Sequence, residues 1–93
     1  QHSISLVNVA KKVYLSPAYL SSLITRETGK SFTDFLSEIR IKHAVDMLRD
    51  KNLKITDIAY KVGFKEPQYF TSTFKKLMNI TPRDYREMYL KDT

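Results

Sequence analysis

Small or polar side chains recur along one face of each of two helical segments, at positions i, i+3, i+4 and i+7. They are Ala18, Ser21, Ser22 and Thr25 in the first segment and Gln68, Thr71, Ser72 and Lys75 in the second. A glutamine can pair bidentately with adenine, an alanine can touch a thymine methyl group, and a lysine can reach a phosphate. A single serine is more often an ordinary solvated residue, but as a set these small side chains would let a helix approach bases closely. The two faces therefore predict contacts with double-stranded DNA.

Catalytic chemistry has no comparable support in the sequence. The chain contains no cysteine, which excludes disulfides and thiolate chemistry. His2 and His43 have no carboxylate, serine or second histidine at catalytic or metal-ligand spacing. We therefore expect no enzymatic activity, no metal and no cofactor, and we expect His43 to lie on a helix surface.

The two polar faces belong to a unit that occurs twice in the chain. Matched residues are offset by 49 through Val13 and Val62, and by 50 from Pro17 and Pro67 onward. A repeat of this period marks a duplicated supersecondary unit. Each copy has a short helix, a tight turn and a capped second helix, which is the helix-turn-helix pattern. Since two copies are too few for a solenoid, we expect them to form two halves of one small domain, residues 1–93.

Helix-start and helix-stop signals divide the chain into six predicted helices. Each proline follows a candidate N-cap (Ser16, Glu66 or Thr81), and proline at the first helical position loses no helix hydrogen bond. Gly29 and Gly63 suit helix ends. The predicted helices cover about 6–13, 17–28, 32–49, 55–62, 67–78 and 82–90. No segment has strand periodicity, so the expected fold is all-α, with two helix-turn-helix subdomains joined by a long linking helix in a homeodomain-like arrangement.

The expected domain organisation follows from this map. A first helix-turn-helix covers about 5–29, a linking helix about 31–49, a second helix-turn-helix about 54–79 and a C-terminal helix about 81–90. A linking helix of about nineteen residues spans ~28 Å, close to the ~34 Å between successive major grooves on one face of DNA. We therefore expect the two recognition helices to read successive major grooves.

The charge distribution favours a polyanionic partner. The net charge is +6 and the isoelectric point is near 9.6. Residues 1–50 carry seven Lys/Arg against five Asp/Glu, and residues 51–93 carry nine against five, so the basic excess leans toward the second copy. No apolar run approaches membrane-spanning length and no signal peptide is recognisable, which predicts a cytoplasmic protein that does not bind membranes. Because the first residue is Gln1 rather than methionine, we expect a fragment or a processed chain.

Other residues suit the phosphate backbone. Lys12 and Lys61 occupy matched positions in the leading helix of the two copies, and that helix normally crosses the backbone. Ser31 and Thr81 also match, and each begins a helix whose free N–H groups and dipole suit a phosphate, although capping alone accounts for both hydroxyls. The expected backbone contacts are Lys12, Thr25, Ser31, Lys61, Tyr69, Thr71, Lys75, Lys76 and Thr81.

A set of motifs runs through both copies and the linking helix. The second copy carries Ile58-Ala59, Val62-Gly63-Phe64, Tyr69-Phe70, Phe74-Lys75-Lys76, Thr81-Pro82 and Tyr85-Arg86. The first copy carries Leu15-Ser16-Pro17-Ala18-Tyr19-Leu20, and the linking helix carries Arg40-Ile41 with Ala44 and Leu48. Taken together, these motifs resemble the DNA-binding domain of the AraC/XylS family of bacterial transcription regulators over essentially the whole chain.

The resemblance implies a domain with two recognition helices that binds asymmetric promoter sites and often contacts RNA polymerase. It also implies that Arg40 is structural, in an ion pair at the rim of the core, and is not a DNA contact. Residues 4–6 and 14–17 are similar to those of family members that follow a phosphoreceiver domain, so we expect an upstream sensor or receiver domain in the full-length chain. The base-contacting residues that it implies are Ala18, Ser21, Ser22, Glu66, Pro67, Gln68 and Ser72.

The sequence departs from the family pattern in four places. The family usually has one more helix before Ser5, and Ile24-Thr25 stand where Phe-Lys is common, which removes a phosphate contact from the first copy. Asn79 replaces a common glycine, a mild change because asparagine tolerates the left-handed conformation. Tyr14 lies near the position that corresponds to Gly63, and its backbone conformation is not predicted.

A basic helical protein-interaction module is the alternative function. Such a module would bind an acidic protein partner in a salt-sensitive way and would show no preference among DNA sequences.

Overall fold

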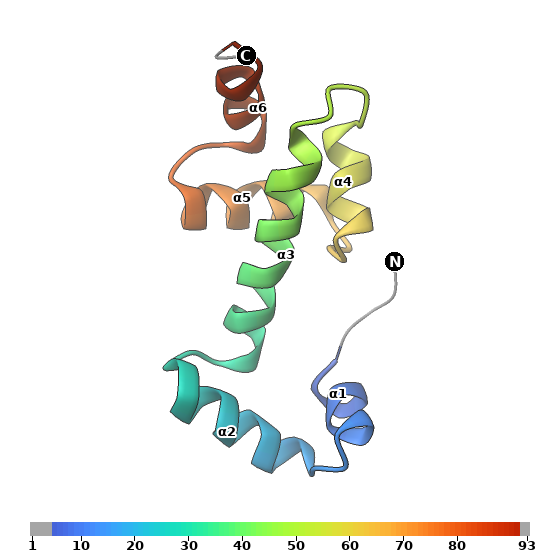
Figure 1. The fold of residues 1–93 in the computed structure, drawn as a ribbon, viewed down its shortest axis with the longest axis vertical. Coiled ribbons are helices and arrows are strands. Elements are labelled where there is room, and N and C mark those ends of the chain that lie inside the picture. Colours follow the sequence, from blue (N-terminus) through green and yellow to red (C-terminus); the bar gives the residue numbers. More distant parts are fainter. Residues whose placement is uncertain (1–4, 92–93) are drawn as a thin grey trace. The chain divides into compact units, whose positions relative to one another are not determined.

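A computed structural model describes residues 5–91, which form six α-helices and no β-strand (Figure 1). The helices are α1 (Leu6–Lys12), α2 (Pro17–Thr28), α3 (Phe32–Leu48), α4 (Ile55–Lys61), α5 (Pro67–Met78) and α6 (Pro82–Lys91). The prediction of an all-α fold is confirmed, and each helix end lies within one residue of the predicted one. Residues 1–4 and 92–93, which include His2, lie outside the described part of the chain.

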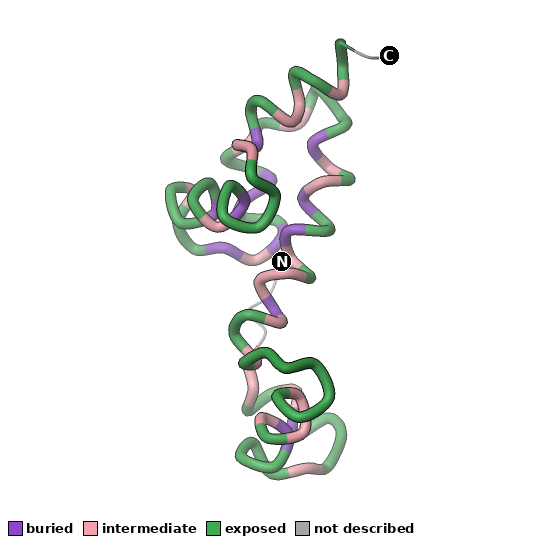
Figure 2. The backbone as a smooth tube through the Cα atoms, turned by 90° about the vertical axis from the view of Figure 1, so that its left-hand side faces the viewer, coloured by how far each residue is buried: buried purple, intermediate pink, exposed green. Residues whose placement is uncertain are grey.

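The chain divides into two compact units, which we call the N-terminal and the C-terminal unit. The described residues of the N-terminal unit are 5–37, with α1, α2 and the start of α3. Those of the C-terminal unit are 38–91, with the rest of α3, α4, α5 and α6. Buried positions are more frequent along the C-terminal unit (Figure 2). Each unit therefore holds one of the two helix–turn–helix pairs, but their cores differ in size.

Hydroxyl caps begin both helix α1 and helix α2 of the N-terminal unit. The Oγ atoms of Ser5 and Ser16 each accept a hydrogen bond from the backbone N–H three residues later, at 3.1 Å. Pro17 occupies the first turn of α2, and Gly29 ends that helix with a left-handed φ of 74°. The buried hydrophobic residues among those described in this unit are Ala10, Leu20 and Leu36. This core is small.

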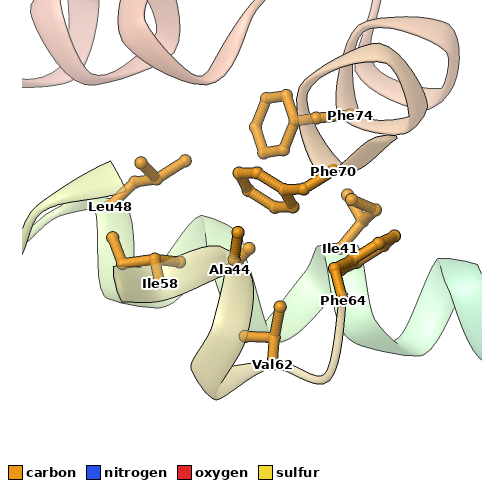
Figure 3. Close-up of a cluster of buried hydrophobic side chains, with 9 residues drawn as sticks. Ile41, Ala44, Leu48, Ile58, Val62, Phe64, Phe70 and Phe74 are labelled. Atoms are coloured by element: carbon orange, nitrogen blue, oxygen red, sulfur yellow. The ribbon is translucent and has the colours of Figure 1, made fainter. Parts of the chain in front are cut away.

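Aromatic rings form the centre of the larger core in the C-terminal unit (Figure 3). Phe70 and Phe74 of α5 are fully buried, and their ring centroids lie 5.8 Å apart. Phe64, in the segment before α5, meets Phe70 edge-on at 5.4 Å. Burying one phenylalanine contributes about 1.5–3 kcal/mol, so these rings hold α5 against α3 and α4. The core residues are Ile41, Ala44, Leu48, Ile58, Ala59, Val62, Phe64, Phe70 and Phe74.

Helix α6 closes the C-terminal unit by binding the end of α3. The last carbonyls of a helix have no partner within it. Arg86 donates from Nε to the Leu48 carbonyl oxygen at 2.9 Å and from Nη2 to the Asp50 carbonyl oxygen at 3.1 Å. The Tyr85 hydroxyl accepts from Arg49 Nε at 3.4 Å, which raises the pKa of the Arg49 guanidinium above its ordinary value. Side chains of α6 thus cap and pair the C-terminal end of α3.

The turn between α1 and α2 and the turn between α4 and α5 each contain a residue with a left-handed backbone conformation. Gly63 has a φ of 109°, whereas Tyr14 at the corresponding position has a φ of 59° and a side chain that is 94% exposed. The left-handed conformation costs a residue other than glycine roughly 1–2 kcal/mol, so Tyr14 is strained. Asn79 ends α5 with a φ of 63°, the conformation that asparagine tolerates.

Arg40 packs against the turn between α4 and α5, where the family resemblance implied an ion pair. Its guanidinium carbon lies 5.7 Å from the centroid of the Phe64 ring, a cation–π contact. Its Nε is buried and has no hydrogen-bond partner among the described residues. A Cβ atom on Gly63 would lie 2.9 Å from that Nε. In the described structure Arg40 therefore supports the turn by packing on Phe64 and Gly63.

Alanine in place of Gly63 should lower the free energy of unfolding by about 2–4 kcal/mol, because it adds backbone strain and a clash with the Arg40 guanidinium. The matched control is alanine in place of Gly29, whose φ is also positive but which has nothing within 4 Å of a Cβ atom. That variant should lose only about 1–2 kcal/mol. Urea unfolding followed by circular dichroism compares the two. Equal losses would contradict the packing role of Arg40.

Amide hydrogen exchange should be slower in α4 and α5 than in α1 and α2. Protection depends on the free energy needed to expose an amide. Fully buried Ile58, Phe70 and Phe74 lie in α4 and α5, whereas Ala10 and Leu20 are the buried residues of α1 and α2. Native-state exchange followed by NMR measures the difference, and equal protection of the two helix pairs would refute this expectation.

Candidate nucleic-acid interface

Helix α2 has one side in the N-terminal core and one side open to solvent. Leu20 is 7% exposed and faces the core. Of the predicted face, Ala18, Ser22 and Thr25 are exposed and Ser21 is half-buried. None of these side chains carries a charge, so any reading by α2 would depend on short polar and apolar contacts.

Helix α5 presents its predicted face fully to solvent. Phe70 and Phe74 are buried on its inner side. The Ser72 hydroxyl donates to the Tyr69 carbonyl oxygen at 3.1 Å, so its lone pairs stay available to accept a hydrogen bond. The exposed residues of this face are Gln68, Thr71, Ser72 and Lys75.

The starts of the two recognition helices differ in how they are capped. Ser16 caps α2 through its Oγ atom, as predicted. Glu66 holds the corresponding N-cap position of α5, but its side chain makes no capping hydrogen bond, and it is exposed. Pro67, which follows it, is half-buried. The expectation that each proline follows a capping side chain therefore fails at Glu66.

The residues predicted to contact phosphates fall into two groups. The lysines are all exposed: Lys12, Lys61, Lys75 and Lys76. The hydroxyl oxygens of Ser31 and Thr81 accept from the backbone N–H groups of Asp34 and Asp84, both at 3.1 Å. Capping uses a lone pair of each oxygen, and each hydroxyl proton stays available for donation to a phosphate. The carboxylates of Asp34 and Asp84 lie in the same first turns, where they would oppose an anion.

The sequence-based prediction included the exposed Tyr69 but missed its counterpart Tyr19. Tyr69 is 55% exposed and its ring lies 5.7 Å from that of Phe64. Tyr19, which the fifty-residue offset matches to Tyr69, is 50% exposed. Both tyrosines thus offer a hydroxyl on the outer side of a recognition helix. The repeat itself was the signal that could have added Tyr19 to the candidates.

The described residues form neither a candidate metal site nor a helix that could span a membrane. No group of three His, Cys, Asp or Glu side chains there could hold a metal ion. His43 is exposed on α3, as expected. Across residues 5–91, none of the helices has the length and apolar character that crossing a membrane requires.

The comparisons with known proteins agree with this geometry. A helix-turn-helix domain profile matches residues 9–88. The transcriptional activator RhaR of Yersinia pseudotuberculosis is 35% identical over 86 residues, which cover 92% of this chain and 30% of RhaR. The C-terminal domain of the two-component response regulator yesN from Fusobacterium nucleatum is 37% identical, with a TM-score of 0.79 over 89% of this chain and 81% of that one. The C-terminal domain of AraT, a response regulator from Geobacillus stearothermophilus, is 39% identical, with a TM-score of 0.82 over 91% and 70%.

Two helix–turn–helix pairs, each with a second helix whose outer face is free of the core, define a helix-turn-helix protein. The chain belongs to the AraC-type helix-turn-helix family of DNA-binding transcription regulators, as its motifs implied. It spans less than a third of the length of the curated relatives that it matches, 11% in one case and 30% in RhaR.

Proposed function

We propose that this domain binds double-stranded promoter DNA sequence-specifically, with α2 and α5 as its recognition helices. The proposal depends on the contrast between the buried side and the exposed side of α5. Phe70 and Phe74 are fully buried, whereas Gln68 and Lys75 are exposed on the opposite side. A helix held in this way can enter a major groove without losing its core contacts. Family membership supports the same function.

The two recognition helices are proposed to differ in strength. On α5, Gln68 reads adenine while Lys75 and Lys76 hold phosphates. On α2, Ala18 touches a thymine methyl group, and Ser21 and Ser22 permit close approach. The described charges support this difference, since the last turn of α5 carries two exposed lysines, whereas that of α2 carries one exposed basic residue, Arg26. We assign the firmer contact to α5 and the more permissive one to α2.

The remaining backbone contacts are assigned to residues around the two recognition helices. The exposed Lys12 and Lys61 end the leading helices α1 and α4, where that helix crosses the backbone. Thr25 and Thr71 offer exposed hydroxyls. The further proposed contacts are Ser31, Thr81, Tyr69 and, from the repeat, Tyr19.

The setting of the domain is also a proposal. The solved relatives yesN and AraT are C-terminal domains of response regulators, which supports an upstream receiver domain in the full-length chain. We propose that the protein acts in the bacterial cytoplasm, carries no catalytic activity and contacts RNA polymerase at the promoter. The last point rests on the family resemblance.

Selection from random duplexes should return one preferred sequence with two contacted segments about one helical turn apart, because two recognition helices would read successive major grooves. Binding should weaken steeply between low and moderate salt, since several phosphate contacts release counterions. Footprinting and fluorescence anisotropy measure the two properties. A single contacted segment would mean that one recognition helix binds alone. Salt-insensitive binding, or equal affinity for all sequences, would refute the proposed function, and the latter would favour a basic protein-interaction module.

Alanine in place of Gln68 should relax the preference at one A·T pair by about 1–3 kcal/mol of discrimination. Alanine in place of Lys75 should instead weaken all sequences alike and reduce the salt dependence by about one phosphate contact. Alanine in place of Lys91, an exposed lysine of α6, removes the same charge outside the proposed interface and is the control. Competition binding against specific and random duplexes separates the two roles, and equal effects of the Gln68 and Lys75 variants on both would contradict them.

A further inference from the structure

Helix α5 begins without a side-chain cap, as does α4, whose N-cap is Lys54. A hydroxyl oxygen accepts a backbone N–H in the first turn at four helix starts: Ser5, Ser16, Ser31 and Thr81. Glu66 has the extended backbone of an N-cap, with φ −126° and ψ 123°, but makes no side-chain cap. Serine and threonine are strongly preferred caps. The N-cap of the second recognition helix therefore holds a carboxylate that makes no capping hydrogen bond, where Ser16 caps the first.

Glu66 also has no other partner in the described part of the chain. Its side chain is exposed, and it takes part in none of the hydrogen bonds or ion pairs formed there. Lys65 beside it is exposed as well. A carboxylate at the tip of a helix that faces DNA is repelled by phosphates. It therefore weakens binding in general unless a specific group on the DNA compensates for it.

The compensating group must be a hydrogen-bond donor, because an ionised carboxylate only accepts. In the major groove the donors on the bases are the N4 amino group of cytosine and the N6 amino group of adenine. Adenine presents its N7 acceptor beside N6, and that nitrogen would face the second carboxylate oxygen. Cytosine has no acceptor beside its amino group there. The carboxylate therefore favours cytosine over adenine, and it disfavours guanine and thymine, which offer acceptors alone.

We infer that Glu66 is a specificity-determining residue that selects a cytosine through its N4 amino group and lowers affinity for sequences without one. The inference rests on the proposed function, that α5 enters the major groove. It assigns to Glu66 a base that Gln68 does not read, since an amide pairs with adenine. Discrimination by Glu66 arises as much from repulsion of wrong sequences as from attraction to the right one.

Two substitutions test the inference on the domain as it stands. Glu66→Ser restores the hydroxyl found at Ser16 and removes the charge. It should abolish a cytosine preference of about 10- to 100-fold at one position, while tightening binding to random duplexes several-fold. Glu66→Gln keeps the length of the side chain and should shift the preference at that position from cytosine toward adenine. Selection from random duplexes gives the base preferences, and anisotropy gives the affinities.

Glu87→Gln is the matched control, since it removes one carboxylate on α6, where Glu87 pairs with Arg83 at 3.6 Å. It should leave the base preferences unchanged. Circular dichroism verifies that each variant keeps its helices. If Glu66 acted only as the N-cap residue of α5, Glu66→Ser would leave every base preference unchanged. That result would overturn the inference. Loss of preference for a base other than cytosine would overturn it too. If the unsubstituted domain itself selected no sequence, the proposed function would fail instead.

Discussion

The burial of Phe70 and Phe74 is the interaction on which the candidate interface depends. Both rings are fully buried among residues of α3 and α4, with Phe64 against Phe70 and Tyr85 of α6 against Phe74, which fixes the rotation of α5 about its own axis. Gln68, Ser72 and Lys75 face solvent because the rings face inward, and no ligand is needed to orient them. The reading surface is thus prepared by the hydrophobic core, and side chains on that surface can change without loss of the fold.

Local signals in the sequence predicted most of the fold. The ends of every helix were predicted to within one residue. The signals were prolines at first helical positions, hydroxyl caps and apolar stripes, which act within one or two helical turns. The contact of Arg40 with Gly63 and Phe64 was not predicted, because it joins residues more than twenty positions apart. The left-handed backbone of Tyr14 was not predicted either. The repeat matches Tyr14 to a glycine, which favours this conformation, but a tyrosine side chain disfavours it.

The outer faces of α2 and α5 were predictable because buried positions on one side of a helix define the other. What the sequence could not show was the state of individual polar groups. Ser31 and Thr81 were predicted both to cap helices and to contact phosphates; the capping is confirmed, and the phosphate contacts stay a prediction. Glu66 was interpreted as a helix start, yet its carboxylate stays free. Such outcomes depend on side-chain geometry within a few tenths of an ångström, which residue spacing does not contain.

The capping of α3 by Arg86 has a consequence for how the chain is made. Arg86 of α6, close to the last described residue, donates to the carbonyls of Leu48 and Asp50, and the Asp50 carbonyl also accepts from the Leu53 N–H at 3.1 Å. During synthesis the N-terminal helices emerge first, while the C-terminal unit stays open at one end until Arg86 has left the ribosome. α5, with its exposed glutamine and lysines, is translated before that closure. A nascent chain would therefore acquire its two recognition helices in sequence, and the unit that holds α5 would close only after Arg86 has emerged.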